Sequence, residues 1–169
     1  MRSCVALLRA VNVGGIKLKM KELSRLCEEA GFESVQTYIA SGNVVFRTGD
    51  DPDRARSVLE ARLEGHMGRP VDVLVRTARE MADLVAANPF PDEPGNKVAV
   101  LFLGQAPPPD LDGRAKGVAA ERFAPAHREV FIHYPDGQGR SKLAFDGLGV
   151  GTTRNMNTVA KLADLAAAL

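Results

Sequence analysis

Cysteine is scarce in this chain, whose 169 residues include only Cys4 and Cys27. Two cysteines are too few for the disulfide framework of a small secreted protein, so we expect two buried free thiols in a reducing compartment. No apolar run approaches the roughly 18 residues that a membrane-spanning helix needs. Arg9 interrupts the short apolar stretch near the N-terminus, which we interpret as a strand and not as a signal peptide. These features predict a cytoplasmic protein without a membrane partner.

The sequence also lacks the motifs that would name a reaction. Its three histidines show no metal-ligand spacing with cysteines or carboxylates. It has no Gly-x-Ser-x-Gly elbow and no phosphate loop that ends in Gly-Lys-Ser/Thr. No metal and no cofactor is therefore implied, and no nucleophile or base can be assigned. Whether the protein is an enzyme stays open.

Charge is balanced overall but unevenly distributed. The formal net charge is +1, yet the first 25 residues contain six basic side chains and a single acidic one, Glu22. Residues 137–169 are also basic on balance, so the segment between the two ends is acidic. This pattern indicates either a local surface that attracts anions or ordinary solvated faces.

Hydrophobic periodicity predicts a β-α-β-β-α-β order over residues 3–76. Apolar or β-branched runs indicate strands at residues 3–9, 34–39, 44–48 and 70–76. Helical spacing of apolar residues starts at Met20 and ends before Gly31, a typical C-terminal cap. Asp51 and Pro52 are typical of the start of a second helix. The order matches the ferredoxin-like plan, so we expect an α+β fold with a ferredoxin-like subdomain at residues 1–76.

Residues 77–169 predict a second, smaller α+β subdomain packed on the first. A capping-box pattern from Thr77 to Glu80 starts a helix. Strands are expected at residues 98–103, near 120–123 and at 129–134, with a weak helix near 111–118. A glycine-rich stretch then precedes a final helix from about Arg154 to Ala168. This order loosely echoes that of the first half, so a degenerate repeat remains one interpretation.

Two turns of the first half carry glycines and polar side chains. In a split βαβ unit the carboxyl end of the first strand lies at the same sheet edge as the turn between the second and third strands. Residues 9–15 should therefore meet residues 38–43. Together the two turns offer a guanidinium, amides, hydroxyls and glycine N–H groups, from Arg9, Asn12, Gly14, Gly15, Tyr38, Ser41, Gly42 and Asn43.

Such a set can hold an anion or a polar small molecule. Arg9 would pair with the negative charge, the asparagines and Ser41 would orient the ligand, and the glycines would present backbone donors. In the alternative interpretation the glycines only permit tight turns, and Asn12 and Asn43 satisfy loop backbone groups. Both interpretations stay open.

A second candidate lies at residues 147–157, where glycines precede a predicted helix. The free N–H groups of a helix N-terminus favour anions, and Arg154 adds positive charge there. The equally favoured alternative is that Thr153 is a plain helix cap and that Arg154 is solvated. Whether Lys142 joins either candidate depends on how the two halves pack.

Several motifs resemble a bacterial family, domain of unknown function 1697. They are LLRAVNVGG, KMKEL and VQTYIASGNVVF near the start, and GRSKL and GTTRNMNTVAKL near the end. The resemblance extends from about residue 3 to residue 165 and departs from the family pattern at Met156, where the pattern has an aromatic residue. It implies an α+β fold with a ferredoxin-like part and no established activity. The polar positions that it implies are Arg9, Asn12, Tyr38, Ser41, Asn43, Lys142, Arg154, Asn155 and Asn157.

Three functions follow as hypotheses. The first is binding of a small anionic ligand, in which a phosphate group would suit the loop after the first strand. The second is nucleic-acid binding through the basic ends, which would weaken steeply with salt. The third is a protein-interaction module that uses an exposed sheet face or edge, whose oligomeric state the sequence leaves open.

Overall fold

The computed structural model describes residues 1–13 and 15–169, which form two compact units. The first unit contains Met1–Ala82 and Lys161–Leu169, and the second contains Asp83–Ala160. The sequence suggested a boundary after residue 76. The two units divide between Ala82 and Asp83, inside helix α3 (Ala78–Ala86), and helix α5 (Met156–Ala167) contributes its C-terminal part to the first unit.

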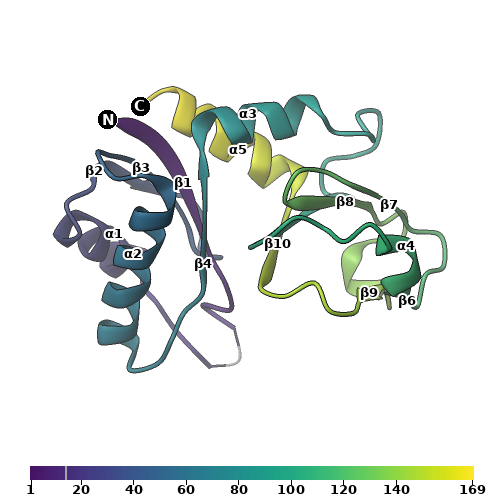
Figure 1. Cartoon of the computed structure of the whole chain (residues 1–169), viewed down its shortest axis with the longest axis horizontal. Coiled ribbons are helices and arrows are strands. Elements are labelled where there is room, and N and C mark those ends of the chain that lie inside the picture. The colour runs from purple at the N-terminus through teal and green to yellow at the C-terminus, as the bar shows by residue number, and fades with distance from the viewer. Residues whose placement is uncertain (14) are drawn as a thin grey trace. The chain divides into compact units, whose positions relative to one another are not determined.

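The first unit is built on a four-stranded antiparallel sheet (Figure 1). Its strands β1 (Arg2–Leu8), β2 (Glu33–Thr37), β3 (Asn43–Thr48) and β4 (Val73–Thr77) lie in the order β2-β3-β1-β4. Helix α1 (Met20–Glu29) connects β1 to β2, and helix α2 (Pro52–Met67) connects β3 to β4. This order agrees with the ferredoxin-like prediction for the first half.

Alternate residues of β1 pack against both helices. Cys4, Ala6 and Leu8 are at most 1% exposed and share one apolar cluster with the inner faces of α1 and α2. Phe32 stacks on Phe46 in this cluster, with ring centroids 4.2 Å apart. The helices contribute Leu23, Leu26, Cys27, Ala55, Leu59 and Leu63.

The helix signals of the sequence are confirmed. The Asp51 side chain accepts a hydrogen bond from the Arg54 N–H at the start of α2, and Gly31 follows α1 with a φ of 90°. Before α3, the Thr77 N–H donates to Glu80 while the Glu80 N–H donates to the Thr77 hydroxyl, which is the predicted capping box.

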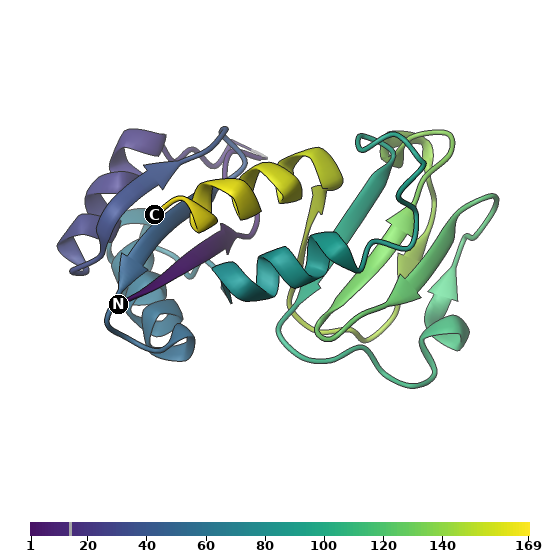
Figure 2. The same cartoon turned by 90° about the horizontal axis from the view of Figure 1, so that it is seen from above.

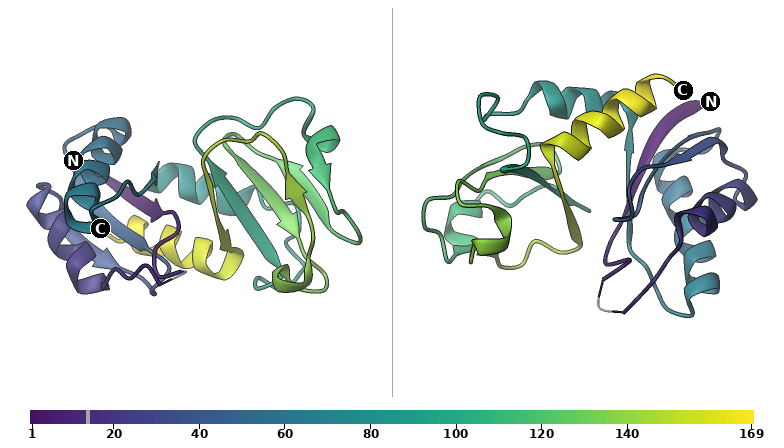
Figure 3. Two further views of the ribbon diagram at one scale, coloured as in Figure 1. Left: turned by 90° about the horizontal axis from the view of Figure 1, so that it is seen from below. Right: turned by 180° about the vertical axis from the view of Figure 1, so that it is seen from behind.

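The second unit holds a separate antiparallel sheet (Figures 2 and 3). Strands β5 (Val98–Leu103), β7 (Arg122–Pro125), β8 (Glu129–His133) and β10 (Gly151–Asn155) lie in the order β10-β5-β8-β7. The short strands β6 (Ala115–Lys116) and β9 (Ala144–Phe145) pair beside it. Helix α4 (Leu111–Arg114) and the 3-10 turn η1 (Gln138–Arg140) complete this unit.

The final helix begins at Met156, two residues after the predicted start at Arg154. Residues Gly151–Asn155 form β10, in which Arg154 pairs with Val100 of β5, and α5 begins only at Met156. The two threonines at 152 and 153 are β-branched and fit an extended strand better than a helix turn. The helix near residues 111–118 is likewise shorter than predicted, because β6 takes over at Ala115. None of the helices in the described ranges is long and apolar enough to cross a bilayer.

Both cysteines are buried free thiols, as predicted. Burial raises the pKa of Cys4 to about 11 and that of Cys27 to about 12. Because only the thiolate is nucleophilic, neither residue is suited to catalysis near neutral pH.

We therefore expect no thiol of the native protein to react rapidly with an aromatic disulfide reagent at pH 8. Both should react once the chain is unfolded in denaturant, because unfolding removes the burial that holds the thiols protonated. The measurement is a thiol titration with and without denaturant. Rapid reaction of one native thiol would contradict the burial of that residue.

Candidate functional site

The predicted meeting of the two turns is confirmed in the first unit. Leu7 at the end of β1 pairs with Asn43 at the start of β3, and the Leu8 N–H donates to the Gly42 carbonyl at 2.8 Å. A Cβ at Gly42 would lie 2.7 Å from Val11 Cγ2, so only glycine lets the two turns approach this closely. Gly42 also has a φ of 86°, a conformation that favours glycine.

The Asn12 side chain ties three segments together. Its Oδ1 accepts the Leu18 N–H at 2.9 Å, and its Nδ2 donates to the carbonyls of Leu18 and Ala40. The amide therefore joins the loop after β1, the stretch before α1 and the β2–β3 turn. These bonds match the interpretation in which Asn12 satisfies backbone groups.

Asn43 has a similar role inside the β2–β3 turn. It is fully buried, and its Nδ2 donates to the Tyr38 carbonyl at 3.0 Å and to the Ser41 hydroxyl at 2.8 Å. The Tyr38 N–H in turn donates to the Asn43 carbonyl at 2.9 Å. Asn43 thus holds the turn that presents the Ser41 side chain at the surface.

Arg9 lies on the other side of the loop, against β4. Its Nη1 is 3.5 Å from the Asp72 carboxylate, and the Arg9 backbone N–H donates to the Asp72 backbone carbonyl. Both side chains are about half exposed, so this ion pair is weak and solvent can enter it. The Arg69 guanidinium approaches the neighbouring Ala10 carbonyl at 3.4 Å.

Backbone strain concentrates in the two turns. The described residues include four non-glycine residues with positive φ, and three of them are Ala10 (58°), Asn12 (57°) and Ile39 (51°). A β-branched residue such as Ile39 rarely adopts this conformation, and each such residue costs on the order of 1–3 kcal/mol. Strain of this kind is typical of functional loops.

Two lysines that the sequence analysis did not select flank the Asn12 bridge. Lys17 and Lys19 are exposed on either side of buried Leu18, whose backbone is held by Asn12. Neither forms an ion pair with any residue in the ranges 1–13 and 15–169. Lys19 is also the N-cap residue of α1. Its side chain makes no capping hydrogen bond, so it does not satisfy the N–H groups of the first helical turn. The alternation of charged and apolar residues in KLK was the signal that could have identified them.

Of the two glycines predicted to present donors, Gly14 lies outside the described residues. Gly15 is exposed, has a φ of 84° and has open space where a side chain would be. Ile39 and Val13, 50% and 55% exposed, add apolar surface to the same two turns.

The remaining predicted residues belong to the second unit. Arg154 is buried on β10, where its Nη1 donates to the Thr152 hydroxyl and the Thr153 carbonyl, and burial lowers its pKa to about 10. The helix cap is Asn155, whose Oδ1 accepts the Thr158 N–H, and not Thr153. Arg154 thus lies in a strand and not in the first turn of a helix.

Asn157 and Lys142 are both exposed. Asn157 lies so close to Gly95 that a Cβ there would be 2.1 Å from its Oδ1. Lys142 is held by the close approach of its carbonyl to Gly117, in a different part of this unit from β10. These contacts place the Asn157 side chain and the Lys142 backbone without assigning either residue a ligand.

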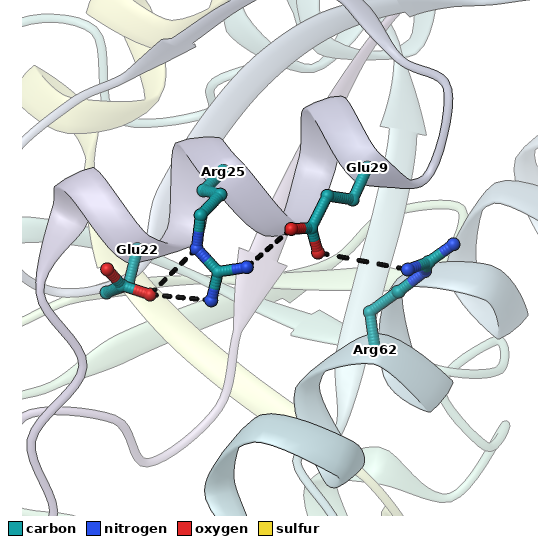
Figure 4. A network of polar contacts seen from close by, with 4 residues as sticks. All are labelled: Glu22, Arg25, Glu29 and Arg62. Carbon is teal, nitrogen blue, oxygen red and sulfur yellow. Dashed lines mark hydrogen bonds and ion pairs between the residues drawn. The ribbon is translucent and has the colours of Figure 1, made fainter.

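A groove is lined by residues of α1 and α2. Charged side chains of these helices pair with one another there (Figure 4). Arg25 bonds to Glu22 and Glu29 on its own helix, and Glu29 lies 3.8 Å from Arg62 on α2. The hydrogen bond from Arg25 lowers the pKa of Glu22. Because these charges satisfy one another, the groove is a less suitable binding site than the two turns. No cluster of three metal-ligating side chains is found within the part of the chain that the structure describes.

We expect Asn12→Gly to destabilise the first unit by about 1–3 kcal/mol, because it removes three hydrogen bonds while glycine still permits the positive φ. Urea denaturation measures this change in the free energy of unfolding. Gln36→Ala, which removes an exposed amide from β2, should change it by less than about 0.5 kcal/mol. Equal stability of Asn12→Gly and the wild type would show that the bridge does not hold the loops.

Comparisons with known proteins give a family but no activity. No curated protein matches the chain. A solved structure of the conserved bacterial protein SP0830 from Streptococcus pneumoniae is similar, with a TM-score of 0.79 and 21% identity over 99% of both chains, which shows the fold alone. The family model described as "Protein of unknown function (DUF1697)" matches residues 1–131. Since this match covers most of the sequence, the chain belongs to the DUF1697 family.

Proposed function

We propose that the protein binds a small anionic ligand at the two turns beyond the carboxyl end of β1. The observation that carries this proposal is the Asn12 bridge, which joins the Leu18 backbone, between the exposed lysines, to the turn that contains Ser41. A fixed group of exposed cations beside hydroxyls is suited to a phosphate or carboxylate group.

The lysines and the start of α1 supply the positive charge. Lys17 and Lys19 form no ion pair in the described chain, and Lys21 adds a third cation in the first turn of the helix, where the acidic residue Glu22 is paired with Arg25. The N-terminus of a helix carries a partial positive charge and free N–H groups, which favour an anion at this position. A phosphate-bearing metabolite is the ligand class that fits this charge best.

The predicted residues take different roles in this proposal. Asn12 and Asn43 position the loops because their amides are engaged with backbone groups and with Ser41. Tyr38 is half-buried and Ser41 is exposed, so their hydroxyls would contact a ligand in this turn, and Arg9 would add charge from the β4 side. Exposed Val13 and Ile39 would contact an apolar part of the ligand.

A nucleic acid is the second candidate, because exposed lysines also contact backbone phosphates. The two ligands differ in their salt dependence. A nucleic acid that contacts several phosphates releases several counterions, so its affinity falls steeply with salt, whereas a single anionic group gives a shallow slope.

We expect Lys17→Ala/Lys19→Ala to abolish the stabilisation that an anionic ligand gives to the wild-type protein. Inorganic phosphate, a hexose phosphate and a short single-stranded oligonucleotide are suitable probes. At a tenfold excess over its Kd, a probe stabilises the protein by about 1.4 kcal/mol, which corresponds to a rise in Tm of about 3–5 °C. Thermal unfolding at two salt concentrations measures both the shift and its salt dependence.

The matched control is Arg2→Ala/Arg47→Ala. It removes the same charge from the opposite end of the sheet, where Ser3 pairs with Arg47, and should keep the full response. If none of the probes stabilises the wild type, or if the lysine variant responds like the wild type, the proposal is wrong. A steep salt dependence with the oligonucleotide alone would favour the nucleic acid.

A further inference from the structure

A cavity lies wholly within the second unit. It has a volume of about 260 Å³ and is formed by the segment after β6, the end of β8 and the residues around η1. Its polar lining consists of Glu121, Tyr134, Asp136, Arg140, Ser141 and Lys142. Since a water molecule takes up about 30 Å³ of liquid, the cavity has room for a small metabolite.

The walls of the cavity are held by backbone contacts. The Lys142 carbonyl approaches Gly117 so closely that a Cβ there would lie 2.3 Å from its oxygen, so only glycine fits. The Gly137 N–H donates to the Tyr134 carbonyl, and Lys97 Nζ donates to the Pro135 carbonyl at 2.9 Å. These contacts hold the backbone segments that form the walls of the cavity.

A carboxylate is oriented inside it. Glu121 accepts the Ala119 N–H at 3.0 Å on one oxygen and the Ser141 hydroxyl at 3.2 Å on the other. The Leu143 N–H donates to Ser141 Oγ, which directs the serine proton toward Glu121. These bonds lower the pKa of Glu121, with the Ala119 N–H as the largest cause, so the group is ionised at neutral pH. A carboxylate has about four acceptor positions, so about two remain for a ligand.

Three further groups lack partners. The ring of Tyr134 is buried at 7% exposure, whereas its hydroxyl makes no hydrogen bond to a described residue and is open to the cavity. Burial raises the pKa of this phenol, and the charge of Glu121 raises it further, so it keeps its proton and can donate. Arg140 and Lys142 are exposed cations without an ion pair in the described chain.

We infer that this cavity is a binding site for a small molecule that joins an anionic group to a hydrogen-bond donor. Arg140 and Lys142 would receive the anionic group, and the Tyr134 hydroxyl would donate to it. The free acceptor positions of Glu121 would receive hydroxyl or ammonium protons of the same molecule. A sugar phosphate and an α-amino acid both have this chemistry. The inference does not depend on the ligand proposed for the first unit.

The test is a titration of the 15N-labelled full chain followed by amide chemical shifts. Ribose 5-phosphate, glutamate and inorganic phosphate are the probes. We expect ribose 5-phosphate or glutamate to shift amides of residues 117–142, and inorganic phosphate alone to bind at least about tenfold more weakly. Shifts confined to residues 9–43 would support only the site in the first unit and would overturn this inference, as would no shift with any probe at 10 mM, a concentration on the order of ten times a ~1 mM Kd.

Two variants distinguish ligand binding at this cavity from a purely structural role of its residues. Arg140→Ala/Lys142→Ala should weaken binding by at least about tenfold, and Tyr134→Phe by about two- to tenfold with the same Tm, because the ring stays in the core. Arg2→Ala/Arg47→Ala, the same change in charge in the first unit, should bind like the wild type. Unchanged affinity in both cavity variants would overturn the inference even if a probe shifts the amides.

Discussion

The antiparallel pairing of β1 with β3 is the constraint on which the first unit depends. Its register places Leu7 opposite Asn43 and lets the Leu8 N–H reach Gly42. A slip by one residue would turn every side chain of β1 to the other face, so Cys4 and Ala6 would leave the core beneath α1 and α2. The same slip would separate Gly42 from Val11. The packing of the core and the geometry of the two turns therefore have one cause.

Strain and hydrogen bonding balance one another in those turns. Ala10, Asn12 and Ile39 adopt positive φ at a cost on the order of 1–3 kcal/mol each, and the three hydrogen bonds of Asn12 offset part of it. An amide used in this way has little capacity left for a ligand. The polar residues of the family motif thus divide into those that build the loops, such as Asn12 and Asn43, and exposed side chains that are able to contact a ligand.

The sequence predicted the first half well because each element there carries its own start or stop signal. These signals act on residues within one helical turn, so they can be recognised from the local sequence. Examples are Asp51, Gly31 and the Thr77–Glu80 pair. The strand β10 was missed because a glycine-rich segment fits both a loop and a strand until a partner strand selects one. The contacts that shape the cavity, Gly117 with Lys142 and Glu121 with Ser141, join residues far apart in the chain. Periodicity contains no information about such pairs.

The effect of the basic segments at the two ends of the sequence depends on where the fold places their side chains. The net charge is +1, and at physiological ionic strength charges are screened over about 8 Å, so a basic segment attracts an anion only where the fold gathers its cations. Lys17 and Lys19 meet this condition because Asn12 fixes the backbone between them. Arg140 and Lys142 meet it because they border the same cavity, opposite a carboxylate that resists a purely anionic ligand. The two proposed sites would therefore select by different means: the first mainly by its positive charge, the second by the pairing of opposite charges within one small volume.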